Sequence, residues 1–355
     1  RDGSSVFGDG HQWGYFPSIS GAWNITEEKF MEGLKESLSL SNLKLRIGYG
    51  VSGNALGFGA YSAVATYGAN GTIISIGGKD YPTLVSTKLA NPDLKWEKTG
   101  MLNIGLDYAF FNGRLNGSIE YYNKVTKDLI WNYPVTSFLY PFSTISANVG
   151  EITNRGIEIS INAIPVQNKN FTWTTTLNLS HNKNKVNKLT NEKFSTASFT
   201  QGDPMVAGVS AEGYTQQIME GEPLGTFFTY EFAGYDEDGT SVYYEHDAET
   251  GARTGTTTKA PKFKDRAVTG CAQPKLNMGW NNTFSYKNWS ASFFFTGVFG
   301  NKIYNGLRAH YTAPDFFAGG KNVLKEFITE RPATDKSSNV PSDNIIASAS
   351  YVRLQ

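Results

Sequence analysis

Apolar and polar residues alternate with a period of two along several segments of the chain. In residues 43–49 the odd positions are Leu, Leu, Ile and Tyr, and the even positions are Lys, Arg and Gly. Residues 102–108, 115–121, 157–162, 171–180 and 289–296 follow largely the same rule. Because successive side chains of an extended strand point to opposite faces, each segment predicts a strand with one apolar and one polar face.

Strands of this kind suit a wall that separates lipid from water. Mean hydropathy is -0.35, and no uninterrupted apolar run approaches the roughly 20 residues that a membrane helix needs. These observations exclude a helical membrane protein but leave a β-barrel open. An aromatic content of 14% and 37 glycines also favour strands and turns over helices.

The links between the predicted strands fall into two length classes that alternate along the chain. Short links lie at residues 111–113, 166–170 and 287–288, and Asn112-Gly113 is a dipeptide that type I′ hairpins prefer because both residues tolerate positive φ. Long polar links occupy residues 52–93, 128–149, 187–275 and 304–347. Short turns on one side and long loops on the other are typical of an outer-membrane barrel, so we predict that the four long segments are extracellular loops.

One link on the short-turn side differs from the others. Thr26 is a candidate helix cap, and Phe30, Leu34 and Leu38 follow at helical spacing, which predicts a short amphipathic helix packed at the base of the barrel. The segments give about nine strands, beginning near Gly14 and ending with residues 348–355. Since nine is odd, and since the sequence starts without a signal peptide, we expect a piece of a longer protein whose other strands close the barrel.

Charge and motifs give no sign of nucleic-acid binding or catalysis. Lys plus Arg and Asp plus Glu each number 32, so no basic surface for nucleic acid is indicated. The single cysteine, Cys271, allows no intrachain disulfide, and the four histidines show no metal-ligand spacing. No G-x-S-x-G, H-E-x-x-H or P-loop motif occurs. We therefore expect neither an enzyme nor a bound cofactor.

One acidic segment bears a partial likeness to a calcium loop. Asp236, Asp238 and Asp247 lie near a glycine, but the full spacing and the terminal glutamate are missing. An ordinary Asp-Gly turn in a solvated hairpin accounts for these residues more simply, so Asp236 and Asp238 are only weak metal candidates.

Several runs of sequence point to a known family. They are residues 13–31 with 43–54, residues 148–165, residues 273–305, and residues 91–130, which read NPDLKWEKTGMLNIGLDYAFFNGRLNGSIEYYNKVTKDLI. In this order they resemble the SusC/RagA family of TonB-linked outer-membrane proteins, the large transport barrels of Bacteroidota. The resemblance implies an all-β, antiparallel transmembrane barrel of about 22 strands. By this resemblance, the chain would supply about nine of them, and we expect the plug domain, the TonB-interacting segment and the final strands to lie outside this sequence.

The resemblance also implies a function. It implies active import of a glycan or a peptide, powered by TonB, ExbB and ExbD through the N-terminal region, with a SusD-like surface lipoprotein as a lid on the long loops. Residues 1–355 would then belong to one barrel domain in contact with outer-membrane lipid. A passive porin and a secreted glycan-binding β-sandwich or adhesin remain open alternatives.

Aromatic residues just beyond one predicted strand end are the candidate contacts with ligand or lid. Trp131, Tyr133, Tyr140 and Phe142 lie together in the segment WNYPVTSFLYPF. Aromatic rings offer platforms for sugar faces and peptide side chains. The alternative is a girdle at the membrane boundary, or packing within the loop.

Overall fold

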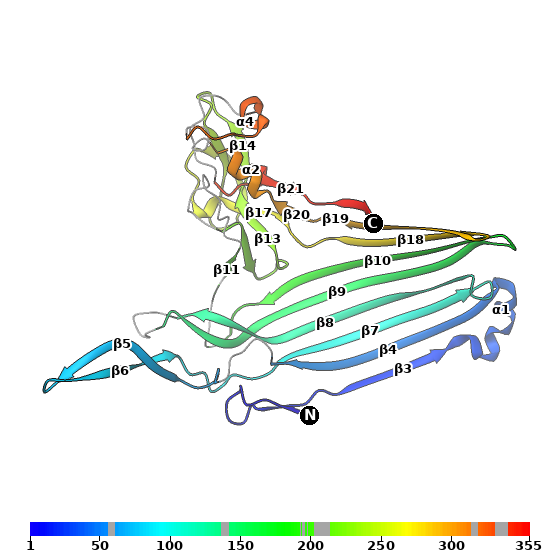
Figure 1. The fold of residues 1–355 in the computed structure, drawn as a ribbon, viewed down its shortest axis with the longest axis horizontal. Coiled ribbons are helices and arrows are strands. Elements are labelled where there is room, and N and C mark those ends of the chain that lie inside the picture. The colour runs from blue at the N-terminus through cyan, green and yellow to red at the C-terminus, as the bar shows by residue number, and fades with distance from the viewer. Residues whose placement is uncertain are drawn as a thin grey trace. The chain divides into compact units, whose positions relative to one another are not determined.

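The computed structural model describes residues 1–55, 61–135, 142–191, 193, 196, 198–201, 214–313, 319–330 and 340–355. Most of these residues lie in strands (Figure 1). The described α-helices are short: α1 (Glu32–Leu38), α2 (Gly306–Tyr311) and α4 (Lys325–Glu330). Among the described residues, no helix has the length and apolar character that crossing a membrane requires.

The largest sheet has nine strands, the number that the sequence predicts. In sheet order they are β3 (Ser18–Asn24), β4 (Leu40–Asn54), β7 (Glu97–Phe110), β8 (Leu115–Pro134), β9 (Thr144–Gln167), β10 (Phe171–Lys188), β18 (Leu276–Tyr286), β19 (Trp289–Phe299) and β22 (Tyr351–Leu354). Sheet order follows chain order, with the elements of the long links left out. Each pair with a defined register is antiparallel.

The two ends of this strand series differ slightly from the prediction. The first strand of the sheet begins at Ser18, because Gly14 belongs to β2 (Trp13–Gly14), which pairs with β1 (Asp2–Gly3). The predicted strand at residues 348–355 is divided: Ser348 ends β21 (Ile346–Ser348), and only β22 joins the large sheet.

The chain divides into two compact units. Unit 1 comprises Arg1–Glu158 and Asn184–Ala197, and unit 2 comprises Ile159–Lys183 and Ser198–Gln355.

In unit 1 the register separates apolar from polar side chains as the alternation predicts. Leu45 lies opposite Leu106, which lies opposite Ile119 on the next strand. The neighbouring row carries Arg46 and Glu120 on the other face, with a glycine between them on β7. Large apolar side chains on the first face, such as Ile47 and Tyr49, are exposed. Exposed apolar rows on one face are what a lipid-facing wall requires.

In unit 2 the apolar face is strongly aromatic. Trp280 stacks on Phe295 with ring centroids 5.7 Å apart. At the hairpin end, Tyr286 pairs with both Phe171 and Trp289, and the side chain of Trp289 is 80% exposed. An exposed aromatic row at a strand end is typical of the girdle at a membrane boundary. The opposite face carries mainly Ser, Thr and Asn side chains of β10, β18 and β19.

The short turns use positive φ angles. Phe111, Asn112 and Gly113 have φ of 52°, 53° and 82°, and the N–H of Gly113 donates to the carbonyl of Phe110 at 3.1 Å. The left-handed conformation therefore starts one residue before the predicted Asn112-Gly113 pair. At the other two-residue turn, Lys287 has φ of 51°.

The predicted base helix forms differently from the expectation. The segment consists of two 3-10 turns, η1 (Ile25–Glu27) and η2 (Lys29–Met31), before α1 begins at Glu32. Thr26 does not cap a helix, because it is buried and its hydroxyl accepts a hydrogen bond from the N–H of Leu43 at 3.4 Å. The side chains predicted to pack at the base, Phe30, Leu34 and Leu38, are exposed.

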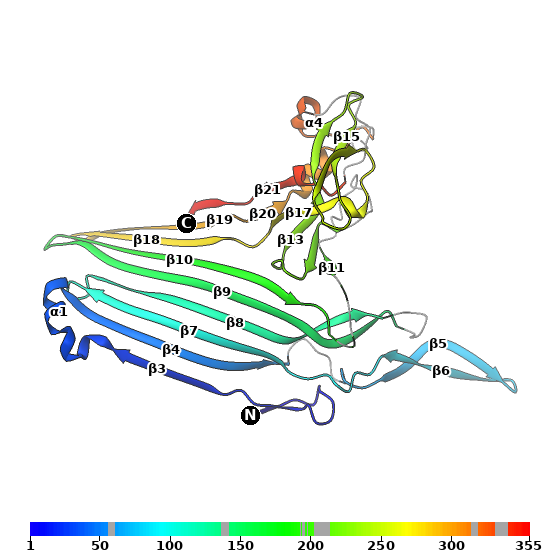
Figure 2. The same cartoon turned by 180° about the vertical axis from the view of Figure 1, so that it is seen from behind.

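The long links carry structure of their own. In unit 1, β5 (Thr66–Ile76) and β6 (Lys79–Lys88) form a hairpin beyond the end of β4 (Figure 2). In unit 2, one sheet contains β11 (Ser198–Gln201), β12 (Gln216–Met219), β13 (Thr226–Tyr230) and β17 (Arg266–Cys271), and another contains β14 (Phe232–Tyr235), β15 (Ser241–His246) and β16 (Arg253–Thr258). β20 (Lys302–Tyr304) pairs with β21, and the 3-10 turns η3 (Phe263–Asp265) and η4 (Asp343–Ile345) complete the unit.

Two strands extend further than the sequence indicates. The segment 128–149 was expected to be a loop, but β8 continues to Pro134 and β9 begins at Thr144. The end of the apolar alternation shows where a strand loses its two-faced character, but backbone pairing can continue beyond that point.

A small apolar cluster in unit 1 lies where these extended strands end. It contains Phe7, Ala63, Leu94, Trp96 and Ile130. The rings of Phe7 and Trp96 are 5.1 Å apart, and the indole N–H of Trp96 donates to a backbone carbonyl at 3.1 Å. This cluster supports one wall of the pocket described next, because Ile130 belongs to both.

Candidate functional site

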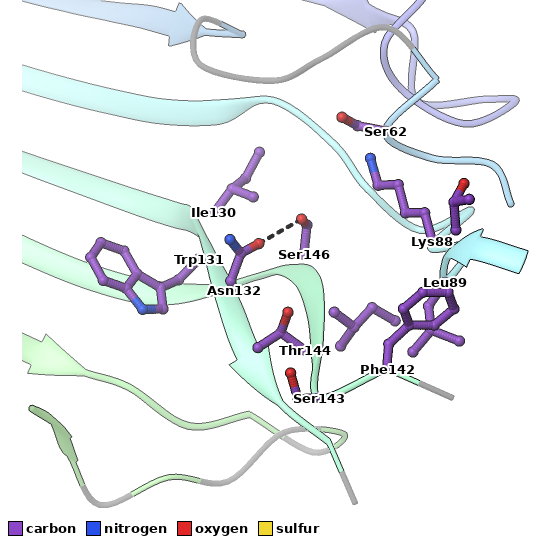
Figure 3. Close-up of a pocket in the computed structure, with 12 residues that line it drawn as sticks. Ser62, Lys88, Leu89, Ile130, Trp131, Asn132, Phe142, Ser143, Thr144 and Ser146 are labelled. Carbon is purple, nitrogen blue, oxygen red and sulfur yellow. Dashed lines mark hydrogen bonds between the residues drawn. The ribbon is translucent and has the colours of Figure 1, made fainter. Parts of the chain in front are cut away.

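A pocket of about 650 Å³ opens in unit 1 at the ends of β6, β8 and β9 (Figure 3). Pockets for small ligands commonly measure about 300–1,000 Å³. The side chains that line it come from the end of β6, from the end of β8 and from the start of β9, with one serine from the first long link. They are Ser62, Thr87, Lys88, Leu89, Ile130, Trp131, Asn132, Phe142, Ser143, Thr144, Ile145 and Ser146.

The β8 wall of the pocket is fixed by a buried carboxylate. Glu97 accepts the backbone N–H of Ile130 through Oε1 at 2.8 Å. Its Oε2 accepts from the side-chain amide of Asn54, also at 2.8 Å. Hydrogen bonds to both oxygens satisfy the buried carboxylate and fix the position of Ile130.

The β9 wall is held by asparagine side chains. The amide of Asn148 donates to the carbonyls of Lys95 and Asp128, at 2.8 Å each, and its oxygen accepts the N–H of Lys95 at 2.9 Å. Asp128 has φ of 56°, and the bond from Asn148 holds this left-handed residue within β8. Asn91 donates to the carbonyl of Ser146 at 2.7 Å. The pocket therefore rests on side chains that are already oriented.

The lining combines apolar surface, hydroxyl groups and one charge. Of the lining residues that the structure describes, Lys88 is the only charged one. Figure 3 shows its ammonium end directed toward Ser62, and the hydroxyl of Ser146 donating to the side-chain oxygen of Asn132 at 2.8 Å. Burial lowers the pKa of the Lys88 ammonium below its ordinary value. The pocket can thus offer hydrogen bonds, an apolar wall and a positive charge to one ligand.

Two of the four predicted aromatic residues are among the residues that line this pocket, but in Figure 3 their rings do not approach each other. Trp131 and Phe142 line it, and the Trp131 side chain is 42% exposed. Tyr133 does not: it is only 1% exposed, and its hydroxyl donates to the carbonyl of Leu189 at 3.0 Å. Tyr140 lies outside the described residues. For Tyr133, packing within the protein is therefore the interpretation that the contacts support.

Sequence reasoning missed the polar part of the pocket. Lys88, Asn132 and Ser146 were not singled out, because each is an ordinary polar residue in a long link or at a strand end. Asn132 directly follows Trp131, so the aromatic cluster pointed to the correct segment. Nothing in the sequence distinguishes Lys88 from the other lysines.

The weak metal candidates form an ordinary turn. Asp236 accepts the N–H groups of Asp238 and Thr240 through Oδ1, at 3.1 and 2.7 Å. The ammonium of Lys259 forms an ion pair with both aspartates, and this contact lowers the pKa of Asp236. Within the described part of the chain, no group of three metal-ligating side chains occurs. The Lys259 ammonium is the cation that these two carboxylates contact.

Comparison with known proteins gives a consistent result. Residues 1–296 match the family model described as TonB dependent receptor-like, beta-barrel. TonB-dependent receptor P3 of Formosa agariphila is 32% identical over 380 residues, which cover 100% of this chain and 35% of that protein. TonB-dependent receptor SusC of Bacteroides thetaiotaomicron is 30% identical over 358 residues, covering 99% of this chain and 34% of that protein.

A solved structure shares the fold. The structure of the RagAB peptide transporter superposes with a TM-score of 0.79 at 24% identity, covering 99% of this chain and 37% of that chain. The chain therefore spans about a third of the length of the relatives that it matches.

Proposed function

The chain belongs to the TonB dependent receptor-like β-barrel family and, within it, to the SusC/RagA proteins; on that premise we propose that it forms part of the wall of an outer-membrane importer that takes up oligosaccharides or peptides. Barrels of this family lie in the bacterial outer membrane. The observation that carries the proposal is the two-faced sheet, with exposed apolar rows on one side and Ser, Thr, Asn and charged side chains on the other.

The physical role of such a wall follows from its two faces. The apolar rows suit contact with lipid. The backbone also suits it, because a closed barrel pairs every strand on both sides and leaves no open edge in hydrocarbon. The polar face offers hydrogen-bonding groups to water and to a passing solute. The role that we propose for this wall is transport without covalent chemistry.

The proposal includes two partners. A SusD-like surface lipoprotein would cover the links at residues 52–93, 128–149, 187–275 and 304–347, which we place on the extracellular side. TonB, with ExbB and ExbD, would supply energy through a region outside this chain. The names of the TonB-dependent relatives support the second partner, and the likeness to SusC supports the first.

Uptake by the full-length protein tests the function. Cells that carry the complete gene would be given fluorescently labelled oligosaccharides and oligopeptides, with and without a functional tonB gene. We expect uptake that needs both genes. Uptake that persists without TonB would instead establish a passive porin, and full-length protein that is soluble without detergent would establish a secreted β-domain.

Purification of the complex tests the lid. The full-length protein would be extracted from outer membranes in detergent, and the mass of each intact subunit would be measured. A lipoprotein that copurifies in a fixed ratio supports the lid. Its absence under conditions in which TonB-dependent uptake is retained would refute the lid and leave the importer intact.

A further inference from the structure

Among the described residues that line the pocket, Lys88 is the one charged side chain. It ends β6 and is half-buried. Among the described residues, no acidic side chain forms an ion pair with Lys88, and none of those that line the pocket is Asp or Glu. Burial has removed part of the water around the ammonium, and the described protein groups supply no opposite charge in its place.

An unpaired, partly desolvated cation in an acid-free pocket favours an anionic ligand. Hydrogen bonds between an ammonium and a carboxylate are shorter and stronger than neutral ones. A single lysine ammonium balances one negative charge, whereas a phosphate monoester carries close to two at neutral pH. The charge balance therefore points to a monoanion.

The other lining residues indicate the chemistry of the ligand beside its negative charge. Leu89, Ile130, Ile145 and Phe142 supply apolar surface, and Ser143 and Thr144 add hydroxyl groups. A pocket of this volume has room for one or two residues of a peptide, or for a comparable length of sugar chain. The ligand should then carry its carboxylate beside a part that can lose water.

We propose that this pocket binds a carboxylate group of the transported ligand, with the ammonium of Lys88 as the counter-ion and the lining of β8 and β9 against the adjoining part of the ligand. The inference rests on the proposed function, because it names the chemistry of an imported solute. The carboxylate can come from the free C-terminus of an oligopeptide or from a uronic acid unit of an oligosaccharide.

Pairs of ligands that differ in one carboxylate measure how much that charge contributes to binding. The full-length protein in detergent would be titrated calorimetrically with an oligopeptide as the free acid and as the C-terminal amide, and with an oligosaccharide that ends in glucuronate or in glucose. We expect the charged member of at least one pair to bind about tenfold more tightly, which is the effect of one partly exposed charged hydrogen bond. The pair that shows the preference identifies the source.

Three variants assign that preference to a residue. Lys88→Met should abolish the difference within the pair, and Lys88→Arg should retain it. Lys79→Met is the matched control, because Lys79 is an exposed lysine at the other end of β6 and does not line the pocket. A wild-type protein without preference in either pair, or a preference that survives in Lys88→Met, would overturn the proposal.

The uptake experiment separates this inference from the importer itself. If TonB-dependent uptake is intact while Lys88→Met keeps the acid preference, the assignment of the pocket is wrong and the importer stands. If the preference depends on Lys88 but uptake does not need TonB, the pocket stands and the importer is wrong. Resistance of the folded barrel to unfolding in detergent, compared between wild type and Lys88→Met, confirms that the variant is folded.

Discussion

Replacing Arg46 by methionine should destabilise the barrel wall measurably. Arg46 lies on the polar face of β4, and its Nε and Nη2 atoms donate to the two oxygens of Asp107 at 2.8 Å each. The same Nη2 also donates to Glu120 at 2.6 Å. Gly105 makes room for the guanidinium, since a Cβ at that position would lie 2.8 Å from Nη2. One arginine thus joins three neighbouring strands.

The size of the effect follows from the exposure of the three side chains. A buried hydrogen bond to a charged group contributes about 1.5–3 kcal/mol, and an exposed ion pair contributes about 0–1 kcal/mol. Arg46, Asp107 and Glu120 are 34%, 29% and 27% exposed, so the network lies between these limits. The methionine variant also leaves two carboxylates side by side without their counter-ion. We expect the free energy of unfolding to fall by about 2 kcal/mol, or about 30-fold in the unfolding equilibrium.

Urea titration of the full-length barrel in detergent, followed by its migration on unheated gels, measures the loss. Arg46→Lys should fall between wild type and Arg46→Met, because lysine keeps the charge but cannot donate to both oxygens of Asp107 in the same geometry. Adding Asp107→Asn and Glu120→Gln to the methionine variant should recover part of the loss by removing the repulsion. A methionine variant as stable as wild type would refute this account of the network.

The remaining predictions test the two faces of the wall, the hydrogen bond of Tyr133 and the ion pair of Asp236. Ile104→Arg should lower the stability of the barrel in membranes by about 2–4 kcal/mol, because its side chain lies on the apolar face, whereas Asn103→Arg on the polar face should change that stability little. Tyr133→Phe should lower the free energy of unfolding in urea by about 1 kcal/mol, because it removes one hydrogen bond. Ligand affinity should stay unchanged, whereas it would fall if the Tyr133 hydroxyl contacted the ligand. Lys259→Met should raise the pKa of Asp236 toward its ordinary value in a carbon-detected NMR titration. Because that pKa is lowered in the folded protein, the stabilisation from the ion pair is present at neutral pH and is lost as the pH falls through the lowered pKa. A titration of Asp236 that is unchanged in Lys259→Met would contradict the ion pair.

The two faces of the wall could be predicted from the sequence because they depend only on local alternation. Once residues 43–49 are extended, Leu45 and Arg46 must point to opposite sides, whatever surrounds them. Turn chemistry acts over an equally short range, which explains why the tight turn near Asn112 was located within one residue. The number of strands in the sheet followed from counting these segments.

Other features depended on partners distant in the sequence. Thr26 matches a helix-cap pattern, yet its hydroxyl accepts from Leu43 on β4, a contact that the local sequence does not contain. The ends of β8 and β9 were misplaced because backbone pairing continues beyond the point where the apolar alternation stops.

The pocket is the clearest case of what tertiary structure decided. The sequence determined that Trp131 and Tyr133 lie in one extended segment, but it did not determine that the first lines a pocket and the second is buried against the carbonyl of Leu189. Lys88 reaches the same pocket from a separate hairpin, and its significance comes from the absence of a carboxylate among the described residues of that lining. Alternation fixes the side of a strand on which a residue lies, whereas the charges that surround the residue are set by strands that only folding brings together.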